Sequence, residues 1–110
     1  MLNILTLAMN GVPYGPVKAT SSNANADLPA TIVTNSARNA VRVVITCEDN
    51  PVRYAFGGLI PVANGLGHVL AANDSLVIGH PAAIASFKFV SAVPGSHGNL
   101  YVTGEYSENV

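Results

Sequence analysis

The chain has 110 residues, enough for one domain, and only 10% of them are charged, compared with about 25% in an average globular protein. With a formal net charge of −1 and no run of lysine or arginine, it lacks the positive surface that attracts nucleic acid, so we expect no nucleic-acid partner. No apolar run approaches the roughly 20 residues of a membrane span, so we expect no membrane partner. The low charge has two explanations: other subunits cover much of the surface, or the surface is neutral and rich in Asn, Ser, Thr, Gly and Ala.

The first 29 residues are predicted to form an N-terminal arm or an edge strand. Residues 2–9 carry apolar side chains on both faces, and such a strand needs cover on both sides. A sandwich interior covers one side, and a neighbouring subunit is expected to cover the other. Residues 10–16 are predicted as a loop that holds Tyr14, and the small, polar residues 17–29 as linker, arm or weak edge strand. The candidate partner-binding residues are Leu2, Ile4, Leu5, Leu7 and Tyr14.

Residues 1–9 are interpreted as mature sequence and not as a signal peptide, because they lack a basic beginning and Asn3 and Thr6 interrupt the apolar stretch. We therefore expect the protein to be made in a cytoplasm. The alternative to an arm is a first strand within the main sheet, followed by a long surface loop.

Residues 41–57 have the clearest strand pattern and are predicted to form a β-hairpin with one buried face. The alternate residues on this face of the first strand are Val41, Val43, Ile45 and Cys47. Those of the return strand are Val52, Tyr54 and Phe56. Asp49-Asn50-Pro51 supplies the turn. Because the single cysteine lies on the apolar face, we expect it to be a small buried residue.

Further short strands are predicted between turn residues along the rest of the chain. They are residues 30–34, 59–62, 68–71, 75–79, 83–91 and 100–106. Pro61 favours an edge position for its segment, and the Phe, Val and Ile content of 82–90 favours a strand over the helix that its spacing also allows. Short strands separated by Gly, Pro and Asn predict an all-β fold, an antiparallel β-sandwich that is jelly-roll-like and has an extended N-terminal arm.

We expect a single domain over residues 1–110. Residues 1–29 are the arm or edge strand, residues 30–106 the sandwich core, and residues 107–110 a tail. The phenylalanines Phe56, Phe87 and Phe89 are expected to lie in the core.

No catalytic, cofactor-binding or metal site is predicted, and the chain is interpreted as non-enzymatic. Its histidines, His68, His80 and His97, are 12 and 17 residues apart, spacings that do not place metal ligands side by side on one strand or helix. Glu48-Asp49 is interpreted as part of a solvated turn, because neighbours on a strand point to opposite faces. Ser96-His97 lacks the third group of a catalytic triad.

Three stretches carry a likeness to a known family: Val-Arg-Val-Val-Ile-Thr at 41–46, Val-Arg-Tyr-Ala-Phe-Gly-Gly at 52–58, and Gly-Asn-Leu-Tyr-Val-Thr-Gly-Glu-Tyr at 98–106. They follow a small, polar segment that begins at Ala19-Thr-Ser-Ser. In this layout, residues 17–106 resemble the small β proteins encoded among the virion structural genes of tailed bacteriophages.

The resemblance implies a capsid decoration or cement protein that binds and stabilises the shell on the capsid exterior of the virion. The implied partners are the major capsid protein and copies of the chain itself, as a homodimer or homotrimer. No cofactor and no small-molecule substrate are implied. A tail or neck structural component is the alternative within the same class.

Two other classes of function stay open. A ligand-binding module, for example for glycans, needs an exposed aromatic platform or groove, and the chain has no tryptophan. A small hydrolase on a β-sandwich needs a cleft that gathers Glu48, Asp49 or a histidine.

Overall fold

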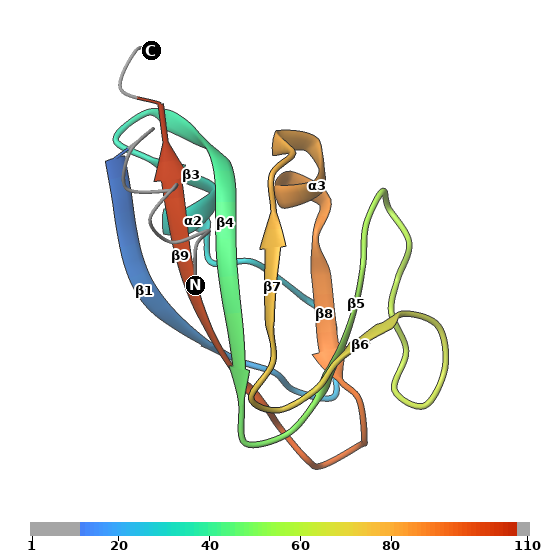
Figure 1. The fold of residues 1–110 in the computed structure, drawn as a ribbon. Coiled ribbons are helices and arrows are strands. Elements are labelled where there is room, and N and C mark those ends of the chain that lie inside the picture. Colours follow the sequence, from blue (N-terminus) through green and yellow to red (C-terminus); the bar gives the residue numbers. More distant parts are fainter. Residues whose placement is uncertain (1–11, 108–110) are drawn as a thin grey trace.

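The computed structural model describes residues 12–107 and consists mainly of β-strands (Figure 1). In chain order the elements are β1 (Val12–Thr20), β2 (Ala26–Asp27), α2 (Ala30–Val33), β3 (Thr34–Asn35), β4 (Arg38–Glu48), β5 (Val52–Ala55), β6 (His68–Leu70), β7 (Ser75–Ile78), α3 (Pro81–Ser86), β8 (Lys88–Ser91) and β9 (Asn99–Tyr106). One antiparallel sheet has the order β1-β9-β4-β3, with β7 also paired to β4, and the other has the order β2-β8-β5-β6. The all-β prediction is confirmed, since α2 and α3 have only four and six residues.

Both sheets contribute side chains to one hydrophobic core. Its buried members are Leu28, Ile32, Ala40, Val43, Ile45, Cys47, Val52, Leu70, Ile78, Ile84, Phe87, Phe89, Leu100, Val102 and Tyr106. The two short helices take part through one residue each, Ile32 from α2 and Ile84 from α3. Phe87 and Phe89 are buried as predicted, whereas Phe56 is only partly buried and packs against the edge of this core.

Strand β4 is the longest strand and pairs with β9 along most of its length. The predicted inward face is confirmed for Val43, Ile45 and Cys47, which are all fully buried. Val41 is the exception, because a register shift between Ala40 and Arg42 inserts a bulge opposite β9. The bulge shifts the alternation by one residue, so Ala40 takes the buried position and Val41 is 38% exposed.

The predicted hairpin between β4 and β5 is wrong, because the two strands belong to different sheets. At the end of β4, Cys47 donates its N–H to the Asp74 carbonyl (3.0 Å) and its own carbonyl accepts from the Asn73 N–H (2.7 Å). The segment that leads into β7 therefore occupies the edge that a returning strand would need. Pro51 has no N–H to give to a ladder, and the short stretch between β4 and β5 carries the chain from one sheet to the other.

The loop predicted for residues 10–16 is also wrong, since Val12 to Pro16 belong to β1, which pairs with β9. The prolines are tolerated because β1 lies at the edge of its sheet, where half of the N–H groups need no partner. The register shifts between Tyr14 and Val17. Gly15, in the middle of this shift, has φ +137°, and a Cβ there would lie 2.7 Å from the Val102 carbonyl oxygen.

Three predicted strands have a different structure. Residues 30–33 form α2, one turn in which the Ile32 and Val33 N–H groups donate to the Pro29 carbonyl (2.9 and 3.2 Å). The first half of the predicted strand 83–91 belongs to α3, which begins at Pro81, a residue that suits the first turn of a helix. Residues 59–62 lie in the connection between β5 and β6 and form no strand.

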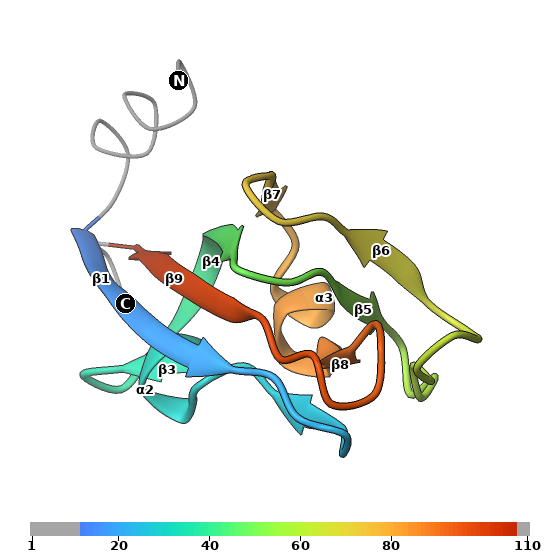
Figure 2. The same ribbon diagram turned by 90° about the horizontal axis from the view of Figure 1, so that it is seen from below.

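The two ends of the described chain lie together, far from the β5–β6 connection. Val12 at the start of β1 pairs with Tyr106 at the end of β9. Figures 1 and 2 both show the start of β1 and the β5–β6 connection at opposite ends of the molecule. Residues 1–11, which include the predicted contacts Leu2, Ile4, Leu5 and Leu7, lie outside the described residues.

Candidate functional site

The connection between β5 and β6, residues 56–67, is held against the body of the protein by hydrogen bonds to its backbone groups. The Asn64 N–H donates to the Ala92 carbonyl (3.0 Å) beyond the end of β8. The Arg53 guanidinium donates through Nη1 to the Gly67 carbonyl (2.9 Å). Pro61 is buried, next to the position that a Cβ on Gly67 would occupy. The loop is therefore fixed at its middle and at its end.

The start of the loop turns sharply. Gly57 and Gly58 both have φ in the left-handed region, +70° and +87°, which glycine adopts without steric cost. The Gly57 N–H donates to the Ser86 hydroxyl of α3 (3.0 Å), which fixes the beginning of the loop as well. A second turn closes on itself through the Gly65 N–H and the Val62 carbonyl (2.9 Å).

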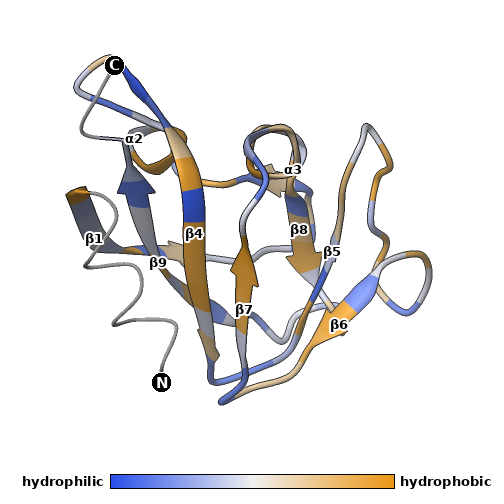
Figure 3. Ribbon diagram, turned by 45° about the horizontal axis from the view of Figure 1, so that its top comes forward, coloured by the Kyte–Doolittle hydropathy of each residue, from blue (hydrophilic) through white to orange (hydrophobic). Residues whose placement is uncertain are grey.

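The loop and the adjoining strand β6 turn large aliphatic side chains toward solvent. We name this set the apolar loop surface; it consists of Leu59, Ile60, Val62, Leu66 and Val69. Their exposed fractions lie between 46% and 58%. They are five of the ten large hydrophobic side chains that are exposed among residues 12–107, although they come from eleven consecutive positions. In Figure 3, hydrophobic residues are seen on parts of the β5–β6 connection and on β6, as they are on the core strands β4, β7 and β8.

The same stretch of the chain also lacks charged residues. Between Arg53 and Asp74 the sequence has no Asp, Glu, Lys or Arg. A fixed loop with exposed aliphatic side chains and no charge is unusual for a surface that stays in water, since contiguous apolar patches mark interaction sites. The sequence contains this signal in the uncharged run around 59–66, but the pattern of residues 59–62 predicts a short edge strand there instead of an exposed loop.

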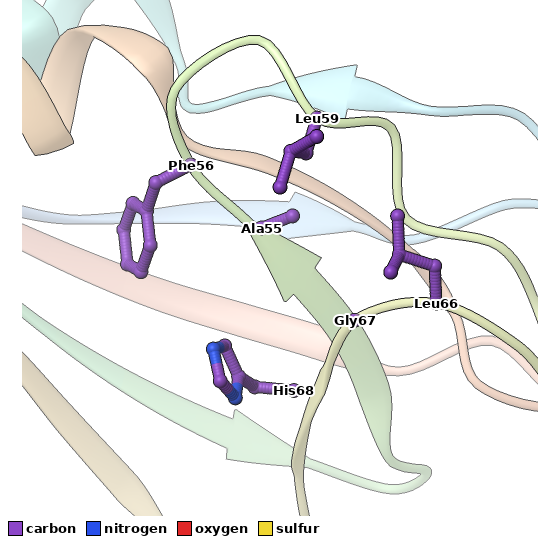
Figure 4. A pocket seen from close by; sticks show the side chains of 6 residues that line it. All are labelled: Ala55, Phe56, Leu59, Leu66, Gly67 and His68. Carbon is purple, nitrogen blue, oxygen red and sulfur yellow. The ribbon is translucent and has the colours of Figure 1, made fainter.

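A pocket of about 490 Å³ opens beside this surface. It is lined by Ala55, Phe56, Leu59, Leu66, Gly67 and His68. Figure 4 shows the Phe56 and His68 rings and the Leu59 and Leu66 side chains around the same space. Its walls are mainly apolar, and His68 is the only side chain among them that can carry a charge, so the pocket suits an aliphatic or aromatic group.

Two residues that line this pocket, Phe56 and His68, belong to a cluster of aromatic rings. Tyr54 stacks on the buried ring of Phe87, with ring centres 5.5 Å apart and planes inclined by 16°. Phe56 meets Tyr54 edge-on at 5.7 Å, and His68 lies 5.4 Å from Tyr54. Contacts of this geometry contribute about 0.5–1.5 kcal/mol each beyond the area that they bury. The pocket is therefore attached to the core through Phe87.

Tyr14, the one predicted contact residue within the described range, lies elsewhere. It is on β1, 43% exposed, opposite Gly104 of β9. It lines a smaller hollow with Arg38 and Tyr106. Burial, and to a lesser extent the nearby Tyr14, raise the pKa of the Tyr106 hydroxyl, which donates a hydrogen bond to the Ile32 carbonyl. The structure does not bring Tyr14 near the apolar loop surface.

A serine–histidine contact occurs that the sequence did not reveal. The Ser91 hydroxyl lies 2.8 Å from His97 Nδ1, the arrangement of a nucleophile and its base. Ser91 is fully buried, however, and its hydroxyl also lies 2.7 Å from that of Ser21. Ser21 in turn accepts a hydrogen bond from the Gly98 N–H (2.8 Å). The contact joins three segments of the chain and does not present a hydroxyl to a substrate.

The acidic residues near Cys47 are spread around the turn after β4. Glu48 and Asp74 line a hollow of about 340 Å³ together with Cys47, and Asp49 accepts a hydrogen bond from the Asn99 amide. Burial raises the pKa of the Cys47 thiol, and the negative charges of Asp49 and Asp74 raise it further. The thiol therefore stays protonated near neutral pH, as expected of a buried structural cysteine.

One buried ion pair lies on the outer face of the β4–β9 ladder. Arg42 Nε is 3.2 Å from Glu105 Oε1, and the Glu105 side chain is only 1% exposed. The other carboxylate oxygen, Oε2, has no hydrogen-bond partner within residues 12–107. The alternation along residues 41–47 places Arg42 opposite the buried face, but no sequence pattern identifies Glu105 as a buried acid.

Within the part of the chain that the structure describes, no three His, Cys, Asp or Glu side chains lie close enough together to hold a metal ion. No described helix is long and apolar enough to cross a membrane. The sequence matches no model of a protein family and no curated protein.

Proposed function

We propose that the chain is a non-enzymatic structural protein that binds other protein subunits through the apolar loop surface. The observation that carries this proposal is the fixed, uncharged loop that exposes Leu59, Ile60, Val62 and Leu66. Complete burial of such a side chain is worth about 1.5–3 kcal/mol, so burying the exposed halves of all five side chains of the apolar loop surface, Val69 included, contributes about 5 kcal/mol. This is less than the about 8 kcal/mol of a micromolar complex. The surface therefore suits one contact among several, as in a symmetric shell.

Within this class we propose a virion protein of a tailed bacteriophage, a capsid decoration or cement protein bound to the major capsid protein on the capsid exterior. A tail or neck component remains the alternative within the class. Three features support the assignment: the layout of residues 17–106, the low content of charged residues, and a surface adapted to burial. The jelly-roll-like sandwich and the N-terminal arm are part of this proposal.

The exposed chemistry favours a protein partner over a glycan. A sugar stacks on an exposed aromatic face, whereas the Tyr54, Phe56 and Phe87 rings pack on one another. The side chains of the apolar loop surface are aliphatic, and they match the apolar side chains at the centre of protein interfaces.

The virion assignment is tested on virus particles purified from cells that encode the chain. We expect mass spectrometry to detect the chain in the particles and antibody labelling to locate it on their exterior. Particles that consistently lack the chain would overturn the virion assignment.

The binding surface is tested by matched valine-to-threonine substitutions. Val62→Thr combined with Val69→Thr changes two members of the apolar loop surface, and Val41→Thr changes an exposed valine elsewhere. We expect the double variant to rebind stripped particles about tenfold more weakly, a loss of about 1.4 kcal/mol, and the control to rebind like the wild type. Equal binding of all three proteins would show that the loop is not part of the contact.

A further inference from the structure

We infer that residues 1–11 of one copy of the chain dock on the apolar loop surface of a second copy. The inference rests on the proposed function, since it names one partner of the proposed binding surface. It joins two features of the same chain: an uncharged apolar segment that precedes β1 in the sequence, and an uncharged apolar surface on the β5–β6 connection.

The two sides match in chemistry. The segment contains the apolar residues Leu2, Ile4, Leu5, Leu7 and Met9 and has no charged side chain. The acceptor likewise has no charged residue between Arg53 and Asp74. Contact between them therefore buries no charged side chain and leaves none unpaired, the condition under which apolar burial gives its full benefit.

The acceptor offers more than a flat patch. The pocket beside Leu59 and Leu66 has a volume of about 490 Å³ and mainly apolar walls, so it can receive an aliphatic side chain. Strand β6 lies at the end of its sheet and pairs only with β5 among the described strands. Its other edge can therefore bond to an extended segment, which would add to the sheet as a further strand.

The geometry favours a second copy over the same one. The segment ends at Val12, at the start of β1, and Figures 1 and 2 place the β5–β6 connection at the other end of the molecule. Eleven residues span at most about 40 Å when fully extended, and the longest dimension of the molecule is 41 Å. A segment that reached the loop of its own chain would need its whole length to cover the distance and would leave no residues for contact. A neighbouring copy can instead place its loop close to Val12.

A contact in which each copy passes its segment to the next copy is heterologous, whereas reciprocal exchange between two copies forms a two-fold, isologous interface. Reciprocal exchange of the segments produces a dimer, and passing each segment to the next copy in turn produces a closed ring such as a trimer. Both arrangements leave the rest of each domain free for a different partner.

The experiment uses full-length variants and light scattering coupled to size-exclusion chromatography. The donor-side variant carries Leu5→Ser and Leu7→Ser, and the acceptor-side variant carries Leu59→Ser and Leu66→Ser. We expect the wild type to form a dimer or trimer and each variant to associate about 10- to 100-fold more weakly. Leu5→Met with Leu7→Met, which keeps the segment apolar, is expected to associate like the wild type.

Mixing the two variants is the decisive step. The donor-side variant still has its loop and the acceptor-side variant still has its segment, so the mixture is expected to form a one-to-one complex that neither variant forms alone. Failure of the mixture to associate, or a donor-side variant that assembles like the wild type, would overturn the inference. A monomeric wild-type chain that still binds virus particles would also overturn it, while leaving the proposed function intact.

A synthetic peptide of residues 1–11 covers the case in which a variant fails to fold. Added to wild-type chain, it is expected to compete for the loop and dissociate the oligomer, whereas the same peptide with serine in place of Leu5 and Leu7 is not. Equal effects of the two peptides, or no effect of either, would contradict the inference.

Discussion

Replacement of Phe87 by alanine tests the connection between the core and the pocket. The ring of Phe87 is fully buried where α3 passes into β8, and it packs against the rings of Tyr54, Phe56 and Phe89. Removing a buried phenylalanine ring costs about 3–5 kcal/mol through lost burial and the cavity that remains. A domain of this size has about 5–15 kcal/mol of stability in total, so we expect a protein that still folds at low temperature but has lost a large part of its stability.

The expected shift in melting temperature follows from the unfolding entropy. At about 2.1 cal/mol/K per residue, 110 residues give about 0.23 kcal/mol/K, so a loss of 4 kcal/mol lowers the melting temperature by about 17 °C. Circular dichroism during heating measures this shift. Phe87→Leu, which keeps most of the apolar volume, is the control and is expected to lose less than half as much. A Phe87→Ala protein that melts within about 4 °C of the wild type would refute the role assigned to this ring.

Three further predictions concern the sheets and the turn. Val43→Asp places a charge in the fully buried face of β4 and is expected to prevent folding; a soluble variant with native circular dichroism would show that this face is assigned wrongly. Arg42→Ala leaves the Glu105 carboxylate buried without its partner and is expected to cost about 3 kcal/mol in urea unfolding, with part of the loss recovered when Glu105→Gln is added. Burial raises the pKa of the Cys47 thiol, so above about pH 8.5 the folded state keeps a proton that the unfolded chain releases. The free energy of unfolding is therefore expected to decrease as the pH rises above this value. Cys47→Ala is expected to remove the contribution of this thiol, so its free energy of unfolding should decrease less than that of the wild type between about pH 8 and 9.5.

The sequence correctly predicts the features of the fold that depend only on neighbouring residues in the chain. The alternation of Val43, Ile45 and Cys47 identified a buried strand face because a strand's side-chain period depends only on its own backbone. Asn64 and Asn73 lie between the segments predicted as strands at 59–62, 68–71 and 75–79, and both have φ in the left-handed region that suits a turn.

The partners of the strands could not be predicted in the same way. Arg42 of β4 pairs with Glu105 of β9, more than sixty positions away, and no local pattern encodes such a distance. The prolines and glycine at 13–16 indicate a loop, yet this segment belongs to the edge strand β1. An edge strand tolerates proline because the N–H groups on its outer side have no partner strand. The first half of 83–91 was predicted as strand from its apolar content, although Pro81 starts a short helix there.

The candidate site depended on the same kind of information. Residues 59–62 are aliphatic enough for a strand, but the loop that contains them is held in place by bonds from Gly57 to Ser86, from Asn64 to Ala92 and from Arg53 to Gly67. The contact between Ser91 and His97 likewise arises from the path of the loop after β8. Such contacts depend on which segments meet in space, which the order of residues alone did not reveal.

The pairing of β1 with β9 has a mechanical consequence. Val12 lies opposite Tyr106, and Thr20 lies opposite Asn99. A force that pulls Val12 and Tyr106 apart acts on one end of this ladder and breaks its hydrogen bonds one after another. A force directed along the strands would instead load all of these hydrogen bonds at the same time. The domain therefore yields at low force when it is held by its two ends. If the protein stabilises a shell under internal pressure, the force has to act through contacts on its faces and loops and not through its two ends.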